Sequence, residues 1–246
     1  MTKFLHYLTE GRTQSIDKDK AFKLIDKHCS KNYDKTMGNK VSKIYRGIKN
    51  FKQDFGYINS NKGELRTSAN TLNYVTLLID NLPSWKDYPK RSKGIICSTD
   101  EGTAYNYGET YQVFPYDNSK IGICPEHDMW DSFYNTFKGH YIIPDINELL
   151  KNTFKYYDIK VDDNNWNSFK NGLEKLDLGI ILKDEFYEAY YQKLAKILFE
   201  TNKNIIQHLN DILSPIKNNF RLGIDNVKTY TDNEIWIQGE CIFMRT

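Results

Sequence analysis

The stretch DNEIWIQGECIF, residues 232–243, decides what kind of fold this chain adopts. β-Branched and aromatic side chains flank Gln238-Gly239, which predicts two strands, Glu234–Ile237 and Glu240–Phe243, joined by a tight hairpin turn. Asp232 and Glu234 stand two positions apart at a strand entrance, so both carboxylates point to the same side of the extended chain. Such a pair can divide stabilising and base roles, although solvated carboxylates are commoner at a strand start.

Further strands are predicted upstream of this stretch. The segment 41–48 (VSKIYRGI) alternates apolar and polar residues, and 94–98 (GIICS) has the pattern of a short buried strand. Two more strands, 111–115 and 120–124, flank the turn-forming Asp117-Asn118. The sheet is therefore expected to draw its strands from distant parts of the chain.

Helical periodicity is predicted in three regions. One helix is expected over 17–29 with Ser15 as its cap, and another over 72–82, opened by Ser68-Ala69-Asn70 and ended by a proline. Between about 131 and 220 the pattern becomes helical, with stretches at 146–157, 166–176 and 184–213. We expect an α+β fold, with one domain over 11–246 that carries a helical insertion at about 131–220.

The composition narrows the function classes. The 246 residues include 39% hydrophobic and 14% aromatic side chains, which is typical of a folded chain. Thirty-four Lys and Arg against 32 Asp and Glu give a net charge of +2, so no whole-molecule field marks a DNA-binding protein. Four scattered cysteines without a CxxC pair predict free thiols in a reducing compartment. No apolar run approaches the roughly 18 residues of a membrane span, so a soluble protein is expected.

Two strand ends carry groups that suit a nucleotide. Arg46 presents a guanidinium fork that can grip a diphosphate or carboxylate, and Gly47 beside it allows a ligand close to the backbone. Ser98 and Thr99 end another strand with two hydroxyls. Taken singly, an Arg-Gly pair is commonly a surface turn, and such hydroxyls commonly cap the next turn.

In chain order, these elements resemble the R-S-E class of mono-ADP-ribosyltransferases, which split NAD and transfer ADP-ribose to a target. In that family an aromatic-Arg strand, a Ser-Thr-Ser strand and an ExE turn converge on one NAD cleft in a split β-sheet. Tyr45-Arg46-Gly47 resembles the first, Ser98-Thr99 the start of the second and Asp232-Asn233-Glu234 the third. The resemblance covers about 40–130 and 230–246, and implies NAD as substrate and no metal.

The resemblance also implies roles for the binding residues. Arg46 would hold the NAD phosphates or ribose, and backbone groups of Gly47 would receive the nicotinamide amide. Ser98 would orient the catalytic glutamate, with Thr99 supporting the strand end. Tyr105 or Tyr107 would stack on the nicotinamide or adenine.

The acidic residues would carry the chemistry. Glu234 would accept a hydrogen bond from the 2′-hydroxyl of the nicotinamide ribose and stabilise the oxocarbenium-like centre as nicotinamide departs. Asp232 would orient or deprotonate the acceptor. The chain departs from the family at two positions. Asp100 replaces a serine and adds a negative charge near the site for the dinucleotide phosphate. Asp232 replaces a glutamate and is one methylene shorter, which puts a preference for an arginine acceptor in doubt.

The N-terminus resembles a phage targeting peptide. Internal head proteins of T-even-type phages, including an injected ADP-ribosyltransferase, carry such a peptide, which the prohead protease cuts after a glutamate in a Leu/Ile-x-Glu pattern. FLHYLTE before Gly11 is similar, with the cut expected after Glu10, while ordinary terminal residues are the alternative. The resemblance implies a leader over 1–10, a location in the phage head and then the host cytoplasm, and a host macromolecule, preferably protein, as acceptor.

Two rival functions stay open. One is a non-catalytic internal head or host-takeover protein that binds a partner. The other is an enzyme that ADP-ribosylates RNA, for which the basic cluster Lys86, Lys90, Arg91 and Lys93 is a candidate contact, although a solvated loop explains it as well.

The remaining candidates are weaker. Cys124 and His127 have a C-x-x-H spacing, but no second pair follows at the distance of a zinc site. His28-Cys29 lacks an evident acid partner for a nucleophilic dyad.

Overall fold

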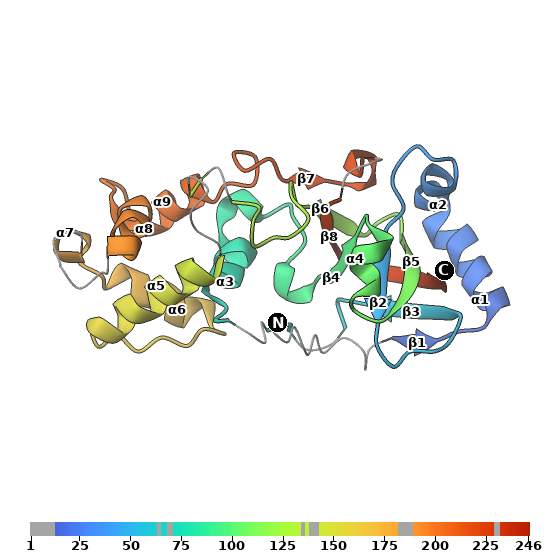
Figure 1. Cartoon of the computed structure of the whole chain (residues 1–246), viewed down its shortest axis with the longest axis horizontal. Coiled ribbons are helices and arrows are strands. Elements are labelled where there is room, and N and C mark those ends of the chain that lie inside the picture. The colour runs from blue at the N-terminus through green and yellow to red at the C-terminus, as the bar shows by residue number, and fades with distance from the viewer. Residues whose placement is uncertain are drawn as a thin grey trace.

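The computed structural model describes residues 13–62, 65–67, 71–133, 136–137, 143–181, 189–228 and 232–246 (Figure 1). Its fold is α+β, with helices around a sheet in which all neighbouring strands run antiparallel. The predicted leader at 1–10 and the helix opening at Ser68-Ala69-Asn70 lie outside the described residues. Within the described ranges, no helix is both long and apolar enough to cross a membrane.

The described strands form one sheet in the order β1-β3-β9-β5-β2-β4-β8-β6-β7. Their bounds are β1 Gln14–Ser15, β2 Tyr45–Ile48, β3 Phe55–Asn59, β4 Ile95–Ser98, β5 Glu109–Pro115, β6 Lys120–Ile123, β7 Arg221–Leu222, β8 Glu234–Gln238 and β9 Glu240–Arg245. Four upstream strand predictions thus have counterparts in β2, β4, β5 and β6. β2 begins only at Tyr45, because the segment before it enters the core as loop, and β3 was not predicted.

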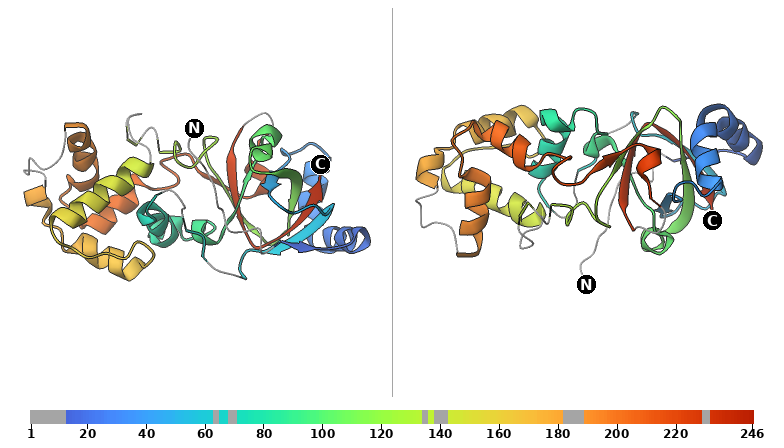
Figure 2. Two further views of the ribbon diagram at one scale, coloured as in Figure 1. Left: turned by 60° about the horizontal axis from the view of Figure 1, so that its bottom comes forward. Right: turned by 90° about the horizontal axis from the view of Figure 1, so that it is seen from above.

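The predicted hairpin at Gln238-Gly239 is wrong. β8 pairs with β4 and β6, whereas β9 pairs with β3 and β5, and three strands separate them in the sheet. Only Gly239 connects them, with φ +140°, a conformation that L side chains rarely adopt. Since Cα atoms are 3.8 Å apart along the chain, Gln238 and Glu240 lie within about 7.6 Å. The sheet must therefore curl until its two halves meet at this residue (Figure 2).

Apolar side chains from both halves fill the inside of the curl. Ile95, Cys97 and Ile235 come from β4 and β8, and they share one buried cluster with Tyr111 and Phe243 of β5 and β9. Each of these side chains is at most 4% exposed. This cluster fixes the curvature, because burial of apolar surface from both halves stabilises the closed form.

Two helices and a π-helix cover the outer face of β5 and β9. They are α1 (Lys18–Leu24), the π-helix Ile25–Cys29 and α2 (Ser30–Met37), and the core between them and the sheet includes Phe114 and Ile242. The predicted cap at Ser15 is wrong, since Ser15 belongs to β1. Asp17 caps α1 instead, accepting a hydrogen bond from Lys20 N at 2.7 Å.

A helical lobe occupies the other end of the molecule (Figure 1). It contains α3 (Tyr74–Asn81), α5 (Ile143–Tyr156), α6 (Trp166–Glu174), α7 (Leu178–Ile181), α8 (Ala189–Phe199) and α9 (Ile205–Ile212). The amphipathic stretch predicted at 184–213 is two helices in its described part, because α8 ends at Phe199 and Asn204 caps α9 through Ile206 N at 2.9 Å.

Trp236 of β8 ties the lobe to the sheet. Its indole is fully buried and donates a hydrogen bond to Pro89 O at 2.8 Å. The rings of Trp85, Tyr88 and Phe220 lie 6.1–6.4 Å from it. The strand that carries Glu234 is thus held between the curl and the lobe.

Candidate functional site

The three motifs meet on three neighbouring strands. β2, β4 and β8 are adjacent in the sheet, and Ser98 of β4 is the ladder partner of Tyr45 on one side and of Glu234 on the other. Directly paired residues on antiparallel strands project from the same face, so Tyr45, Ser98 and Glu234 form one row. Arg46 follows Tyr45 on β2, so its side chain leaves the opposite face, the face of Cys97 and Tyr111, and the structure does not bring it into the row. Gly47 returns to the face of the row.

The Ser98 hydroxyl forms two hydrogen bonds beside the row. It donates to Asp232 Oδ1 at 3.3 Å and accepts from Asp100 N at 2.9 Å. Ser98 therefore contacts the first acidic residue of the D-x-E motif, rather than Glu234 as the resemblance implied. Ser98 is 6% exposed whereas Asp232 is exposed, so this contact lies between the buried row and the surface.

Thr99 and Asn233 lock the entrance of β8. Thr99 N donates to Asn233 O at 3.1 Å, and Asn233 N donates to Thr99 Oγ1 at 2.8 Å. The Asn233 side chain donates to Cys124 O at 3.0 Å, which ties the loop after β6 to the same point. These bonds fix the backbone on both sides of the acidic pair.

Glu234 is buried in an ion pair that the sequence did not reveal. The Glu234 residue is 8% exposed, and its Oε1 accepts a hydrogen bond from the guanidinium of Arg91. Met129 N donates to Oε2 at 3.4 Å. The positive charge of Arg91 offsets the free-energy cost of removing the Glu234 carboxylate from water.

The loop that presents Arg91 is itself anchored. Arg91 N and Ser92 N donate to the two oxygens of Asp80 at 2.5 and 3.2 Å, and the Arg91 guanidinium lies 6.0 Å from the Trp236 ring centroid. Arg91 was predicted as part of an exposed basic cluster with Lys86, Lys90 and Lys93. That placement is wrong for Arg91, whose side chain is 13% exposed.

Asp128 is a second acid that sequence reasoning missed. Burial, followed by the negative charge of Glu234, raises the pKa of Asp128 to about 6. Its Oδ1 accepts from Trp130 N at 2.9 Å, which holds the carboxylate in the turn that wraps Glu234. No motif marks Asp128 in the sequence; only a raised pKa beside another carboxylate identifies it.

Arg46 and Gly47 are placed by the strand and by α4 (Glu101–Tyr105). The Arg46 guanidinium donates to Ile96 O across the strands. Gly47 has no room for a side chain, because a Cβ there would lie 2.0 Å from Ala104 O. Val113 N donates to Ile44 O, so the alternation of the ladder turns the backbone groups of Gly47 toward β4, where Gly47 is level with Ile96.

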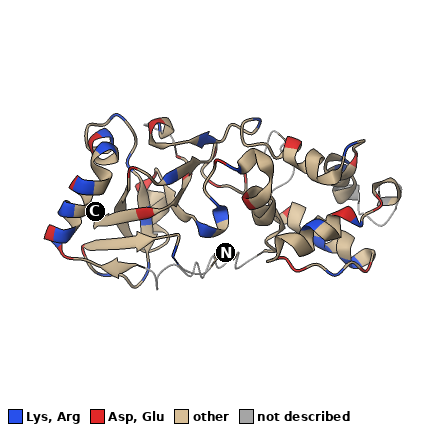
Figure 3. Cartoon of the chain, turned by 180° about the vertical axis from the view of Figure 1, so that it is seen from behind, with Lys and Arg blue, Asp and Glu red and all other residues tan. Residues whose placement is uncertain are grey.

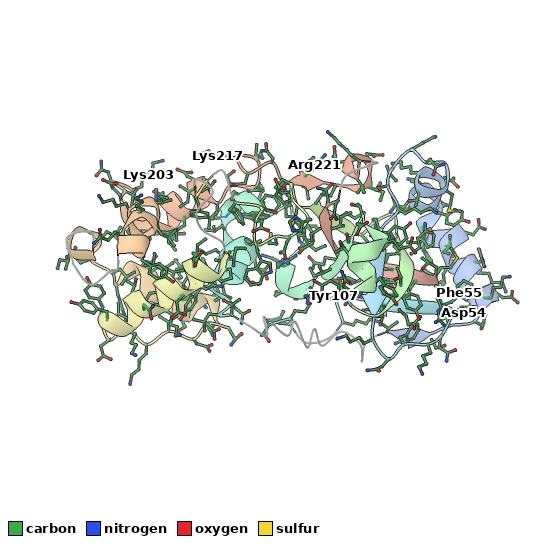
Figure 4. All side chains as sticks on the ribbon, viewed as in Figure 1. Asp54, Phe55, Tyr107, Lys203, Lys217 and Arg221 are labelled. Atoms are coloured by element: carbon green, nitrogen blue, oxygen red, sulfur yellow. The ribbon has the colours of Figure 1, made fainter. Side chains whose placement is uncertain are left out.

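Tyr105 and Tyr107 lie at the end of α4, where Tyr107 is labelled in Figure 4. They are 72% and 42% exposed. Asp100, the departure from the family serine, is the N-cap of this helix: its side chain accepts from Thr103 N at 2.6 Å, and this bond lowers the pKa of Asp100. The negative charge therefore has a structural role.

A small cavity of about 50 Å³ lies beside the ion pair and is lined by Arg91, Arg66, Thr67 and Trp130, among others. Among the described residues, no group of three or more His, Cys, Asp or Glu side chains is arranged to hold a metal. Cys124 is fully buried, with its thiol pKa raised by burial, while the exposed His127 faces Asp131 at 3.8 Å. The C-x-x-H spacing thus gives no shared site.

No known protein helps to assign this site. The sequence matches no family model, and comparisons with curated proteins and with solved structures gave no match. The geometry of the row and of its neighbours is therefore what points to a function.

Proposed function

We propose that this chain is a mono-ADP-ribosyltransferase that transfers ADP-ribose from NAD to a macromolecular acceptor, preferably a protein, and releases nicotinamide. The supporting observation is the row Tyr45–Ser98–Glu234, in which residues separated by up to 189 positions lie on adjacent strands. The row brings together the serine and the glutamate that an NAD cleft of the R-S-E kind uses, and Arg46 follows Tyr45 on the same strand. The source that fits the N-terminal resemblance is a phage head protein acting in the host cytoplasm.

In the proposed reaction, the bond between the ribose C1′ and the nicotinamide nitrogen breaks, and its electron pair leaves with nicotinamide. Glu234 accepts a hydrogen bond from the ribose 2′-hydroxyl and stabilises the positive charge at C1′. The acceptor nucleophile then forms a bond to C1′ and gives its proton to Asp232. Backbone groups of Gly47 hold the dinucleotide, and Tyr105 or Tyr107 stacks on one of its rings. Arg46 binds the dinucleotide only after its guanidinium leaves Ile96 O.

The residues fit this substrate on one condition. A carboxylate can accept about four hydrogen bonds, and Glu234 uses Oε1 for Arg91 and only a long contact for Oε2. The ribose hydroxyl can therefore bind Oε2 while Arg91 stays in place. Because Glu234 is 8% exposed, the loop around Met129 has to open to admit the ribose.

The test uses the purified full chain with labelled NAD and a bacterial lysate. We expect nicotinamide release and labelled acceptor, both lost in Glu234→Gln, which keeps the size of the side chain. Glu126→Gln is the matched control, because Glu126 is an exposed acid beside the same strand. Release of nicotinamide by Glu234→Gln at the wild-type rate would contradict the proposal, and nuclease treatment of the labelled product separates RNA from protein acceptors.

The burial of Glu234 favours one rival function. An acid neutralised by Arg91 can serve stability alone, as in a non-catalytic protein that presents its surfaces to a partner. That rival predicts that Glu234→Gln leaves the biological effect on the host intact. It also predicts no nicotinamide release by the wild-type chain with any lysate.

A further inference from the structure

A second cavity lies far from the Glu234 row, between α1 and the sheet. It has a volume of about 650 Å³, and its lining includes Lys20, Leu24, Lys27 and His28 on the helix side and Tyr57 and Glu240 on the sheet side. Pockets of roughly 300–1,000 Å³ are typical of small-molecule sites. None of these residues belongs to the proposed transferase site.

The helix wall is shaped by the π-helix Ile25–Cys29. A π-helical turn inside α-helix is rare and occurs frequently at functional sites. Here it carries His28, whose ring stacks on Tyr116 with centroids 4.8 Å apart and planes 9° apart. Asp117 N donates to His28 O at 2.7 Å, and the Asp117 carboxylate accepts from Asn32 N at 3.1 Å. The wall is thus fixed without any ligand.

The sheet wall offers a hydrogen-bond acceptor. The Tyr57 hydroxyl donates to Glu240 Oε1, and burial together with this bond raises the pKa of Tyr57 to about 12, so the phenol stays a donor. The other oxygen, Glu240 Oε2, makes no hydrogen bond with the described residues. Glu240 can therefore accept from N–H groups of a bound molecule.

The helix wall offers positive charge instead. Lys20 and Lys27 are exposed, and neither forms an ion pair with a described residue. Figure 3 shows further Lys residues along α1 and α2, interspersed with Asp residues. Apolar surface lies between the charges, from Leu24 on one wall and Tyr57 on the other.

We propose that this cavity binds a mononucleotide whose base presents N–H donors, such as a guanine nucleotide. The base would lie between Leu24 and Tyr57 and donate to Glu240, as planar rings favour apolar and aromatic surfaces. The phosphate would bind Lys20 and Lys27. Inorganic phosphate would contact only the two lysines, and a nucleoside would contact only Glu240. The contributions of the phosphate and of the base can therefore be measured separately.

The experiment is calorimetric titration of the full chain with guanosine 5′-monophosphate, guanosine and inorganic phosphate. We expect the nucleotide to bind more tightly than either part. Glu240→Gln should weaken its binding about tenfold, the effect of one lost charge-assisted contact. The double variant Lys20→Ala/Lys27→Ala removes two such contacts and should weaken binding by more than about tenfold. Lys23→Ala is the matched control on the same helix and should bind as the wild type does.

Three results would overturn the proposal. They are no nucleotide binding at millimolar concentration, phosphate binding as tightly as the nucleotide, and an affinity unchanged in both variants. Glu234→Gln separates the two sites: loss of nucleotide binding in that variant would move it to the transferase row and also contradict this assignment. Retained nucleotide binding in Glu234→Gln supports the site beside α1, whether or not the chain releases nicotinamide from NAD.

Discussion

Ser98 and Glu234 are direct partners in the ladder between β4 and β8, although 136 positions separate them in the chain. Their side chains leave the same face of the sheet, yet each binds something else: Ser98 binds Asp232, and Glu234 binds Arg91. The hydroxyl and the carboxylate are thus neighbours with separate partners. A molecule entering between them would find one hydroxyl, two acids and one guanidinium.

Removal of Arg91 should destabilise the fold strongly. Arg91→Ala leaves the Glu234 carboxylate buried without its cation, and breaking such a pair costs about 3–5 kcal/mol. Urea denaturation measures the loss. The double variant Arg91→Ala/Glu234→Gln should recover part of the lost free energy of unfolding, since it carries no unpaired carboxylate. If nothing is recovered, the unpaired carboxylate is not the cause of the loss.

Asp128 should make stability depend on pH. Its pKa of about 6 in the folded chain is above the ordinary value of 3.8, so folding favours the protonated form. This contribution to stability is full below the ordinary pKa and is lost as the pH rises through 6. Asp128→Asn should therefore raise the free energy of unfolding at pH 7 by at most roughly 3 kcal/mol, with the gain vanishing near pH 4. A gain that is constant with pH would contradict the assignment.

Gly47 should tolerate no side chain. A methyl group there would collide with Ala104 O, so Gly47→Ala has to displace α4 and with it Tyr105, at a cost of roughly 3 kcal/mol. Thermal denaturation gives the change. Gly179→Ala serves as the comparison, because its nearest contact would be an ordinary 3.4 Å, and it should be close to neutral.

The four cysteines should be unreactive in the native protein. Cys29, Cys97, Cys124 and Cys241 are free thiols, as the sequence predicted, and each is buried. Burial raises the pKa of Cys29 and of Cys97 to about 12, so no thiolate forms at neutral pH. A thiol reagent should label none before denaturation and all four after it. Rapid labelling of the native chain would contradict the burial.

The sequence predicted individual strands and helices better than it predicted which strands pair. The strands at 95–98 and 120–123 were predicted from apolar runs with turn residues beside them. The proline expected to end the helix after residue 82 lies just beyond α3. The hairpin at Gln238-Gly239 failed because a turn-like dipeptide says nothing of which strands pair. Pairing across the sheet is decided by the buried cluster inside the curl, which no local pattern contains.

In the candidate site, too, local sequence predicted single residues but not the contacts between them. Arg46, Ser98 and Glu234 could be proposed because each stands at a strand end with a suitable neighbour. The partner of Glu234 could not, because Arg91 is 143 residues away and looked like one member of a basic loop. Only the fold brings that loop under β8, where Asp80 holds its backbone.

Gly239 has a mechanical consequence. One residue joins the strand of Glu234 to the strand of Glu240, so this junction has no slack. A displacement of β8 along its axis has to pull or push β9, and with it the wall of the second cavity. The two halves of the sheet therefore move together, and lengthening this junction by a few glycines would let them move independently.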